Sequence, residues 1–375
     1  MARTVTEPPA TEDTWTSESP PPTPQPRGAA DPRGAARRRR YRRRRLVLAV
    51  VALLVLGAPA WFVVNAYPIG SPGPAALFQI TTGEPIGQVI ATMAGKDIVS
   101  SELAFRLDLM VTGAPTVQPG WYAIPTSSSF AAAKAALSNG PNAQVVTTVT
   151  AKASWEIAQD LAGTPGAGPG FARKFESYVH NGTVHSPFQT SPHTSLEGLL
   201  APGTYVLVPG ETPKTLLAQM VARFTARAAS VGLLPSTTLH GLDAYQLVTV
   251  ASIVEKEGYY AVNMPKTATV VFNRLARGMP LQMDSTVEYA LRQDGGPVTQ
   301  ATEQIPSPYN TYLNLGLTPS PICTPSTQAL DATLHPPGGP WLYFVVVTNS
   351  GEMAFSSTYA EQQANEALAA RRGLS

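Results

Sequence analysis

Cysteine and histidine are scarce in this sequence. Its 375 residues include one cysteine, Cys323, and five histidines. A single thiol cannot form a disulfide within the chain, and it leaves no partner for a cysteine-rich metal site. The histidines are scattered without the spacing of metal ligands, and none belongs to an HExxH pattern. The sequence therefore predicts no metal site and no cofactor.

Charge is also sparse, and it is unevenly distributed. Charged residues make up 14% of the chain, and the net charge is +2. Residues 1–45 contain eleven arginines and five acidic residues, which leaves 16 basic and 20 acidic residues, or −4, for residues 46–375. The runs Arg37–Arg40 and Arg42–Arg45 are of a kind found in nucleic-acid-binding tails. An apolar run follows them directly, so we predict a membrane segment and no nucleic-acid partner.

That apolar run, Leu46–Val64, has 19 residues without a charge and is long enough to span a bilayer. Trp61 and Tyr67 lie at its far end, where interfacial aromatic residues are common. A cleaved signal peptide has a shorter apolar core, although Ala58-Pro59-Ala60 resembles a cleavage site and keeps this alternative open. The arginines place the N-terminus in the cytoplasm and everything after Tyr67 outside the cell membrane. The sequence therefore predicts a single-pass anchor.

The regions on either side of the anchor differ in composition. Residues 1–36 are rich in Pro, Ser, Thr and Ala, so we predict a disordered cytoplasmic tail, which extends with the arginine cluster over residues 1–45. A Pro/Gly linker occupies residues 65–76. Residues 77–143 show the pattern of a strand, two helices, a second strand and an alanine-rich helix. This order resembles a small carbohydrate-binding LysM-like module, although the periodicity alone predicts only the elements.

Residues 144–375 are predicted to form a larger α+β domain. Its expected elements are a strand at 145–149, a helix at 155–161, a loop at 163–170, an irregular segment at 171–195, a strand at 206–208, and helices at 216–229, 244–258 and 266–277. Near the C-terminus, the unbroken apolar run 341–348 predicts a central buried strand. Residues 358–371 are predicted to form an amphipathic helix.

Two glutamates occupy the end of one predicted helix. Its apolar positions follow a helical spacing, and they are Leu247, Val250, Ala251 and Val254. Glu255 and Glu257 flank this face roughly 160° apart, so they cannot both act on one bond. One of them, half covered by apolar neighbours, is suited to a raised pKa and to general acid catalysis. The alternative is a pair of solvated glutamates near a helix end closed by Gly258.

Several separated blocks of the sequence resemble one known family. They are LEGLLAPGTY (196–205), ASIVEKEG (251–258), VFNRLARGMPLQMDSTVEYAL (271–291), SPYNTYLNLGLTPSPICTPS (307–326), LHPPGGPWLYFVV and FSSTYAEQQA. In this order they resemble the endolytic murein transglycosylases, the YceG-like proteins. The resemblance implies an α+β fold: a single-pass membrane anchor, a small LysM-like module, and an α+β YceG-like catalytic domain.

The resemblance also implies a reaction. Such an enzyme cleaves the MurNAc-GlcNAc β-1,4 bond of nascent glycan strands, leaves a 1,6-anhydro-MurNAc end, and terminates strand elongation. Glu257 matches the catalytic acid, and Glu255 matches a structural residue. One carboxylate is enough, because the muramyl 6-hydroxyl attacks after Glu257 protonates the leaving oxygen. The implied partners are peptidoglycan strands, the plasma membrane, penicillin-binding synthases, and the elongation or division machinery.

A hydrolase would need a second carboxylate roughly 5–10 Å from the first. Asp284 is the candidate, although a cap on a helix at 286–292, or a sugar contact, is the preferred interpretation of this residue. The sequence departs from the commoner family form beside it. Met283 and Ser285 stand where a small polar residue and a proline are usual.

Polar and aromatic side chains near Asp284 complete the predicted site. Tyrosine rings stack on sugars, and amides form hydrogen bonds with them. Gln282 has both a donor and an acceptor, which suits an N-acetyl group. The predicted substrate-binding residues are Gln282, Asp284, Ser285, Thr286, Tyr309, Asn310, Thr311 and Tyr312. The alternative for residues 309–312 is a turn with core tyrosines.

Three functions remain open on the sequence alone. The first is the lytic transglycosylase, the second is a muramidase-type hydrolase in which Asp284 assists water, and the third is a non-catalytic cell-wall-binding scaffold. The intact EKE block at 255–257 speaks against the scaffold. Only the chemistry of the product separates the first two.

Overall fold

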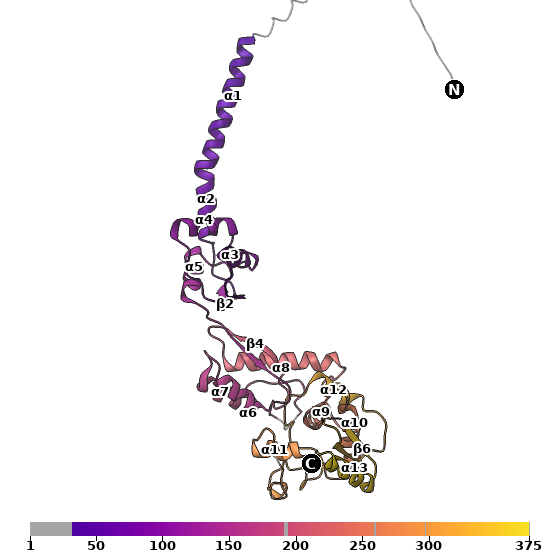
Figure 1. The fold of residues 1–375 in the computed structure, drawn as a ribbon. Coiled ribbons are helices and arrows are strands. Elements are labelled where there is room, and N and C mark those ends of the chain that lie inside the picture. Colours follow the sequence, from indigo (N-terminus) through magenta and orange to yellow (C-terminus); the bar gives the residue numbers. More distant parts are fainter. Residues whose placement is uncertain (1–31, 191–193, 259, 297, 375) are drawn as a thin grey trace, which may run out of the picture. The chain divides into compact units, whose positions relative to one another are not determined.

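A computed structural model of the chain describes residues 32–190, 194–258, 260–296 and 298–374 (Figure 1). The chain divides into two compact units, of which the first ends at Val64 and the second begins at Asn65. Most of the tail predicted at the N-terminus, residues 1–31, lies outside the described residues. The finer division of the second unit at residues 77–143 and 144–375 stays a prediction.

The predicted anchor is helical throughout. Helix α1 (Pro32–Ala52), the π-helical turn η1 (Leu53–Gly57) and helix α2 (Ala58–Ala66) follow one another without a break. Within them, Tyr41–Ala66 is 26 residues long and apolar enough to cross a membrane, and no residue of its apolar window is buried. The wide turn η1 ends two residues before Pro59, whose ring cannot fit a regular α-helical turn and which lacks an N–H.

The segment after the linker contains the elements that the sequence predicts. Strands β1 (Ala75–Ile80) and β2 (Gly120–Pro125) pair antiparallel, with Phe78 opposite Tyr122. Helices α3 (Ile86–Gly95) and α4 (Glu102–Thr112) connect them, and α5 (Phe130–Asn139) follows. Buried aromatic rings hold these elements together, since Phe78 stacks on Tyr122 and Phe105 contacts Phe130. The elements are therefore confirmed, and the LysM-like character stays a prediction.

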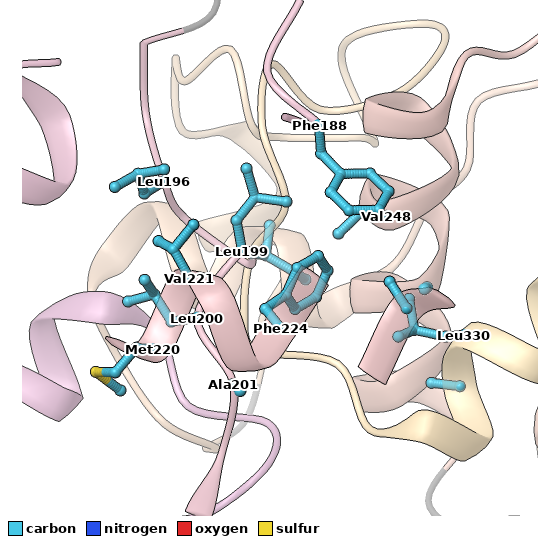
Figure 2. Close-up of a cluster of buried hydrophobic side chains, with 14 of the residues drawn as sticks. Phe188, Leu196, Leu199, Leu200, Ala201, Met220, Val221, Phe224, Val248 and Leu330 are labelled. Carbon is cyan, nitrogen blue, oxygen red and sulfur yellow. The ribbon is translucent and has the colours of Figure 1, made fainter. Parts of the chain in front are cut away.

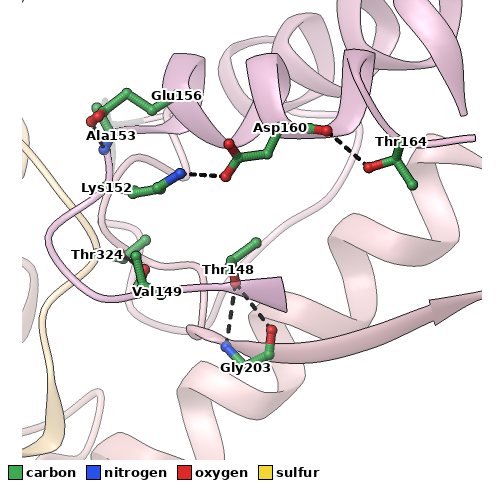
Figure 3. Close-up of polar contacts among 9 residues, drawn as sticks. All are labelled: Thr148, Val149, Lys152, Ala153, Glu156, Asp160, Thr164, Gly203 and Thr324. Atoms are coloured by element: carbon green, nitrogen blue, oxygen red, sulfur yellow. Dashed lines mark hydrogen bonds and ion pairs between the residues drawn. The ribbon is translucent and has the colours of Figure 1, made fainter. Parts of the chain in front are cut away.

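The next sheet joins residues that are far apart in the sequence. Strand β3 (Gln144–Thr148) pairs antiparallel with β4 (Gly203–Leu207). Figure 3 shows the Thr148 hydroxyl bonded to the backbone of Gly203 at the end of this pair. The same figure shows Lys152 paired with Asp160 at 2.5 Å across the first turns of α6 (Ser154–Ala162). These contacts fix the direction in which α6 leaves the sheet.

The segment at 171–195 is not irregular as predicted. Helix α7 (Gly168–His180) covers its first part and begins inside the predicted loop at 163–170. The buried positions Ala172, Phe175 and Val179 recur at i, i+3 and i+7, which is a helical spacing. The charged residues between them mask this pattern. Part of the remaining segment, residues 191–193, lies outside the described residues.

Helix α9 (Ala244–Glu257) lies in the largest buried core, and all but three of its 14 residues are buried. It contacts α10 (Met264–Ala276) and α12 (Thr327–Leu334). Helix α8 (Pro213–Ser230) contributes Met220, Val221 and Phe224 to the same core, and Figure 2 shows these side chains in one cluster with Val248 of α9. Burying each such side chain contributes roughly 1.5–3 kcal/mol, so the position of α9 is strongly determined.

The C-terminal elements differ from two predictions. The apolar run at 341–348 forms β5 (Tyr343–Val346), which pairs in a two-stranded hairpin with β6 (Met353–Ser356) instead of lying centrally in a sheet. All four residues of β5 are partly exposed, and three of them, Phe344, Val345 and Val346, line a cleft. Helix α13 (Tyr359–Arg371) forms as predicted, but it is not amphipathic, since its buried residues are only Gln362 and Ala369.

Candidate active site

Glu257 is the last residue of α9, and its side chain is half-buried. Its Oε1 accepts hydrogen bonds from the backbone N–H and the hydroxyl of Ser285, at 3.3 and 2.7 Å. The pKa of Glu257 is raised to about 7, mainly by burial; the charges of Asp284 and Glu288 add to this increase, and the hydrogen bonds from Ser285 oppose it. A carboxyl group with this pKa is protonated at neutral pH often enough to donate a proton.

The partner of Glu257 lies at the start of another helix. Ser285 is the second residue of α11 (Asp284–Leu291), so its N–H is one of the free donors at that helix N-terminus. The positive end of the helix dipole favours a negative charge there. Helix α11 therefore meets the end of α9 in a way that stabilises the ionised form of Glu257.

A cleft of about 460 Å³ opens beside Glu257. One part of its lining is polar and comes from the end of α9, from α11 and from the loop after α11. The other part is apolar and comes from the β5–β6 hairpin. The lining side chains are Lys256, Glu257, Asp284, Ser285, Glu288 and Asp294 in the first group, and Phe344, Val345, Val346 and Met353 in the second. Such mixed surfaces suit a sugar, which has hydroxyl groups and apolar C–H faces.

Arg274 of α10 fixes two sides of this cleft. Its Nη1 donates to the carbonyl of Leu281 at 2.5 Å, in the segment that leads into α11. Its Nε donates to the carbonyl of Leu342 at 2.7 Å, directly before β5. Because one rigid guanidinium group binds both segments, it sets the separation of Ser285 from the hairpin.

The turn of the hairpin is held separately. Asn263 donates from Nδ2 to the carbonyl of Gly351 at 2.9 Å. Gly351 has a φ of +77°, and a Cβ there would lie 2.0 Å from the ring of Tyr260. Only glycine fits this position, because a side chain would be strained and would collide with the ring.

Glu255 points to a different part of the molecule from Glu257. It is buried, and its Oε2 accepts a hydrogen bond from the N–H of Ser326 at 2.9 Å. Ser326 is the N-cap of α12. Glu255 and Glu257, on the same helix, thus bind two different helices, α12 and α11. This agrees with the angular separation of the two side chains read from the sequence.

Asp284 does not cap a helix, so this part of its sequence interpretation is wrong. Helix α11 begins at Asp284 itself, the N-cap position belongs to Met283, and no side chain caps it. The hydroxyl of Thr286 instead donates to the carbonyl of Met283 at 2.7 Å. Asp284 is exposed in the cleft, and its Oδ1 accepts a hydrogen bond from the hydroxyl of Tyr312. Gln282 is also exposed and has a φ of +49°.

Three of the predicted binding residues are buried in hydrogen-bond networks. Thr286 and Thr311 contact each other through their hydroxyls at 2.9 Å, and the Thr311 hydroxyl accepts from the N–H of Met283 at 3.0 Å. Asn310 donates from Nδ2 to the carbonyls of Glu303 and Ile305, at 2.9 and 3.0 Å. These side chains shape the loops around the cleft without lining it.

Tyr309 lines a second cavity, of about 230 Å³. Its ring centroid is 4.7 Å from that of Tyr289, on α11, and its hydroxyl bonds to Ser320 at 2.8 Å. The structure therefore does not place Tyr309 in the cleft of Glu257. The residues that it does bring together there, from the predicted set, are Asp284 and Ser285.

Glu197 is a buried carboxylate that the sequence interpretation missed. It accepts hydrogen bonds from the N–H and hydroxyl of Ser154, at 3.0 and 2.5 Å, and from the hydroxyl of Tyr289 at 3.2 Å. Burial raises its pKa, against the bonds from Ser154 and Tyr289. The sequence signal for a buried carboxylate was the position of this charged residue among apolar neighbours, Leu196 and Leu199, both of which are buried in the structure. Glu197 ties the start of α6 to α11.

Among the described residues, no three His, Cys, Asp or Glu side chains are grouped so as to hold a metal ion. Cys323 is fully buried, and burial raises the pKa of its thiol well above the ordinary value. A thiol in this state is a poor nucleophile. The titratable group best placed for chemistry in the cleft is Glu257.

An α+β fold that presents a carboxyl group with a pKa of about 7 in a sugar-sized cleft is typical of enzymes that cleave glycosidic bonds. The model of the YceG-like family matches residues 78–367. The chain therefore belongs to the YceG-like family.

Individual relatives agree with this membership. The endolytic murein transglycosylase of Bacillus subtilis (strain 168) is 27% identical over 299 residues, which cover 76% of this chain and 81% of the relative. That of Streptococcus pneumoniae R6 is 34% identical over 178 residues, 46% of this chain and 32% of the relative. The chain thus spans about a third of the pneumococcal relative.

A solved structure shares the fold. The crystal structure of a YceG-like protein from Listeria monocytogenes aligns with a TM-score of 0.52 and 23% sequence identity. The alignment covers 78% of this chain and 99% of that one. This likeness confirms the predicted α+β, YceG-like fold for the aligned part of the chain.

Proposed function

We propose that this protein is an endolytic murein transglycosylase, a lyase that cuts the glycan strands of peptidoglycan. The observation that carries the proposal is Glu257, a carboxyl group with a pKa of about 7 that lines a cleft and accepts two hydrogen bonds from Ser285. Family membership supports it, as does the Bacillus subtilis relative of the same name, which matches over most of both chains.

The reaction needs one carboxyl group. Glu257 donates its proton to the oxygen that links muramyl C1 to the next sugar, and the C1–O bond breaks. The 6-hydroxyl oxygen of the same muramyl residue then attacks C1 intramolecularly and forms a bond to it. Its proton passes to the Glu257 carboxylate, which restores the acid. No water is consumed, and the product ends in a 1,6-anhydro ring.

A muramidase-type hydrolase is the second candidate, because Asp284 lines the same cleft as Glu257. In that reaction a second carboxylate activates water or attacks C1. The hydrogen bond from Tyr312 to Asp284 Oδ1 favours the transglycosylase, since it occupies one of the two carboxylate oxygens.

The location and the partners are further parts of the proposal. Tyr41–Ala66 would anchor the chain in the cell membrane, with the arginine-rich N-terminus in the cytoplasm and the catalytic domain extracellular. The segment at 77–143 would act as a LysM-like glycan-binding module. Proposed partners are nascent peptidoglycan strands, penicillin-binding synthases, and the elongation or division machinery.

The product identifies the reaction. Purified protein in detergent is incubated with glycan strands in heavy-oxygen water, and the released muropeptides are analysed by mass spectrometry. We expect 1,6-anhydro-muramyl ends without label. Labelled reducing muramyl ends would establish the hydrolase instead, and the absence of any release would favour a scaffold. Glu257→Gln is the matched control for contaminating activity.

A further inference from the structure

Every hydrogen bond that the described residues make to the carboxyl group of Glu257 comes from Ser285 and ends on the same oxygen. The N–H and the hydroxyl of Ser285 both donate to Oε1. Within that described part of the chain, Oε2 receives no donor. The two oxygens of this carboxyl group are therefore inequivalent before any substrate binds.

We propose that Ser285 is the positioning residue of Glu257: it directs the transferable proton to Oε2 and stabilises the carboxylate left when that proton departs. The proposal rests on the proposed transglycosylase function. It assigns Ser285 a role toward the acid instead of the substrate contact expected from the sequence.

The first part of the argument concerns the proton. A backbone N–H can only donate, and a hydroxyl that donates needs an acceptor lone pair. In a neutral carboxyl group the carbonyl oxygen is the better acceptor, and the other oxygen carries the proton. Two donors directed at Oε1 make it the carbonyl oxygen, so the proton resides on Oε2. This leaves Oε2 as the oxygen that can reach a substrate in the cleft.

The second part concerns the charge that forms during the reaction. When Oε2 gives its proton to the leaving oxygen, both bonds from Ser285 become bonds to an anion, which are about twice as strong. Donors already in place stabilise a developing charge without reorganisation. The 6-hydroxyl then returns a proton to Oε2, and the starting state is restored. Ser285 itself gains and loses nothing.

Other titratable groups near Glu257 do not replace Ser285. Asp284 and Glu288 of α11 disfavour the carboxylate. Lys256, the neighbour on α9, pairs with Asp294 at 3.0 Å. Arg274 of α10 and Tyr312 direct their hydrogen bonds to other partners, although Arg274 and Glu257 also interact through their charges. Ser285 is thus the group that opposes burial and the two acidic neighbours at close range.

The position of Ser285 does not depend on its own hydroxyl. The backbone of Met283, two residues before Ser285, is held at its N–H by Thr311 and at its carbonyl by Thr286. The side chain of Ser285 is buried, with 7% of the residue exposed. Ser285→Ala removes one oxygen atom and keeps the N–H, so α11 is expected to form normally in this variant.

The test measures the acid directly in the full-length protein in detergent micelles. Glutamate is labelled with carbon-13 at the carboxyl group, and the Glu257 signal is assigned by its loss in Glu257→Gln. We expect Ser285→Ala to raise the pKa of Glu257 by about one unit. Ser285→Thr, which keeps the hydroxyl, should retain the parent value. Ser138→Ala, an exposed position on α5, is the control for losing a serine hydroxyl elsewhere.

Kinetics provide the second readout. Ser285→Ala should lower kcat on glycan strands about tenfold or more, with little change in KM, and should move the alkaline limb of the pH profile upward. Ser285→Thr should restore most of kcat. An unchanged Glu257 pKa in Ser285→Ala overturns the proposal. The titration needs no substrate, so it remains decisive even if the parent protein proves to have no transglycosylase activity.

Discussion

The hydroxyl of Tyr312 donates a hydrogen bond to Oδ1 of Asp284, the carboxylate that lines the same cleft as Glu257. Burial raises the pKa of Tyr312, and the bond to Asp284 raises it further, so the phenol keeps its proton. Tyr312 is therefore a permanent donor to Asp284. This hydrogen bond occupies one of the two oxygens of the Asp284 carboxylate.

Asp284→Asn tests whether Asp284 takes part in the chemistry. An asparagine oxygen still accepts from Tyr312, so the loop should keep its form. We expect kcat to fall less than about tenfold and the anhydro product to remain, as measured by muropeptide mass spectrometry. Loss of turnover as complete as in Glu257→Gln would instead identify Asp284 as nucleophile or base.

Glu255 and Glu257 provide a matched pair on one helix. Glu257→Gln keeps the shape but removes the transferable proton, so turnover should fall by at least about 100-fold with the fold intact. Glu255→Gln keeps an acceptor for Ser326 N–H but loses the charge, so it should mainly cost stability, about 1 kcal/mol. Assays of turnover and thermal unfolding on both variants separate the two roles. Reversed effects would show that the acid is Glu255.

Helical periodicity predicted much of this site, because the core fixes α9. Leu247, Val250, Ala251 and Val254 are all buried, and their spacing gives the directions of Glu255 and Glu257. Their hydrogen-bond partners could not be read from spacing. Ser285 lies 28 residues after Glu257, and Ser326 lies 71 residues after Glu255. Such contacts depend on how whole helices pack.

Burial also separates residues that share a sequence block. Of residues 309–312, Asn310 and Thr311 are buried, Tyr309 lines another cavity, and Tyr312 binds Asp284. A polar or aromatic side chain fits a sugar site and a loop core equally well in a sequence. The resemblance at 281–286 carried a better signal: the sequence departs from the usual proline at Ser285. A proline would provide neither the N–H nor the hydroxyl that Glu257 accepts.

The proposed membrane topology rests on the apolar helix within Tyr41–Ala66 and on the arginines at residues 37–45. We expect a reporter fused at the C-terminus to be active only when it lies outside the membrane, and the full-length chain to sediment with membranes. A reporter fused before residue 41 should behave in the opposite way and serves as the control. C-terminal activity in the cytoplasm, or recovery of a soluble shortened chain, would contradict a retained anchor.

The raised pKa of Glu257 predicts two different effects of pH. Activity requires the protonated acid, so kcat/KM should fall about tenfold per pH unit above pH 7. Stability should change over a lower range. In the unfolded chain the carboxyl group has its ordinary pKa of about 4.3, and in the folded protein the value is about 7.

Between these two values the folded state binds more protons than the unfolded state, so stability is greatest below about pH 4.3 as far as this group is concerned. This contribution of Glu257 to stability is lost as pH rises toward 7, by about 3–4 kcal/mol, because the ionised carboxylate is costly in its half-buried position. Glu257→Gln cannot ionise, so urea unfolding from about pH 5 to pH 7.5 should show the decline in the parent protein only. Parallel curves for the two proteins would mean that Glu257 titrates normally and is not the acid.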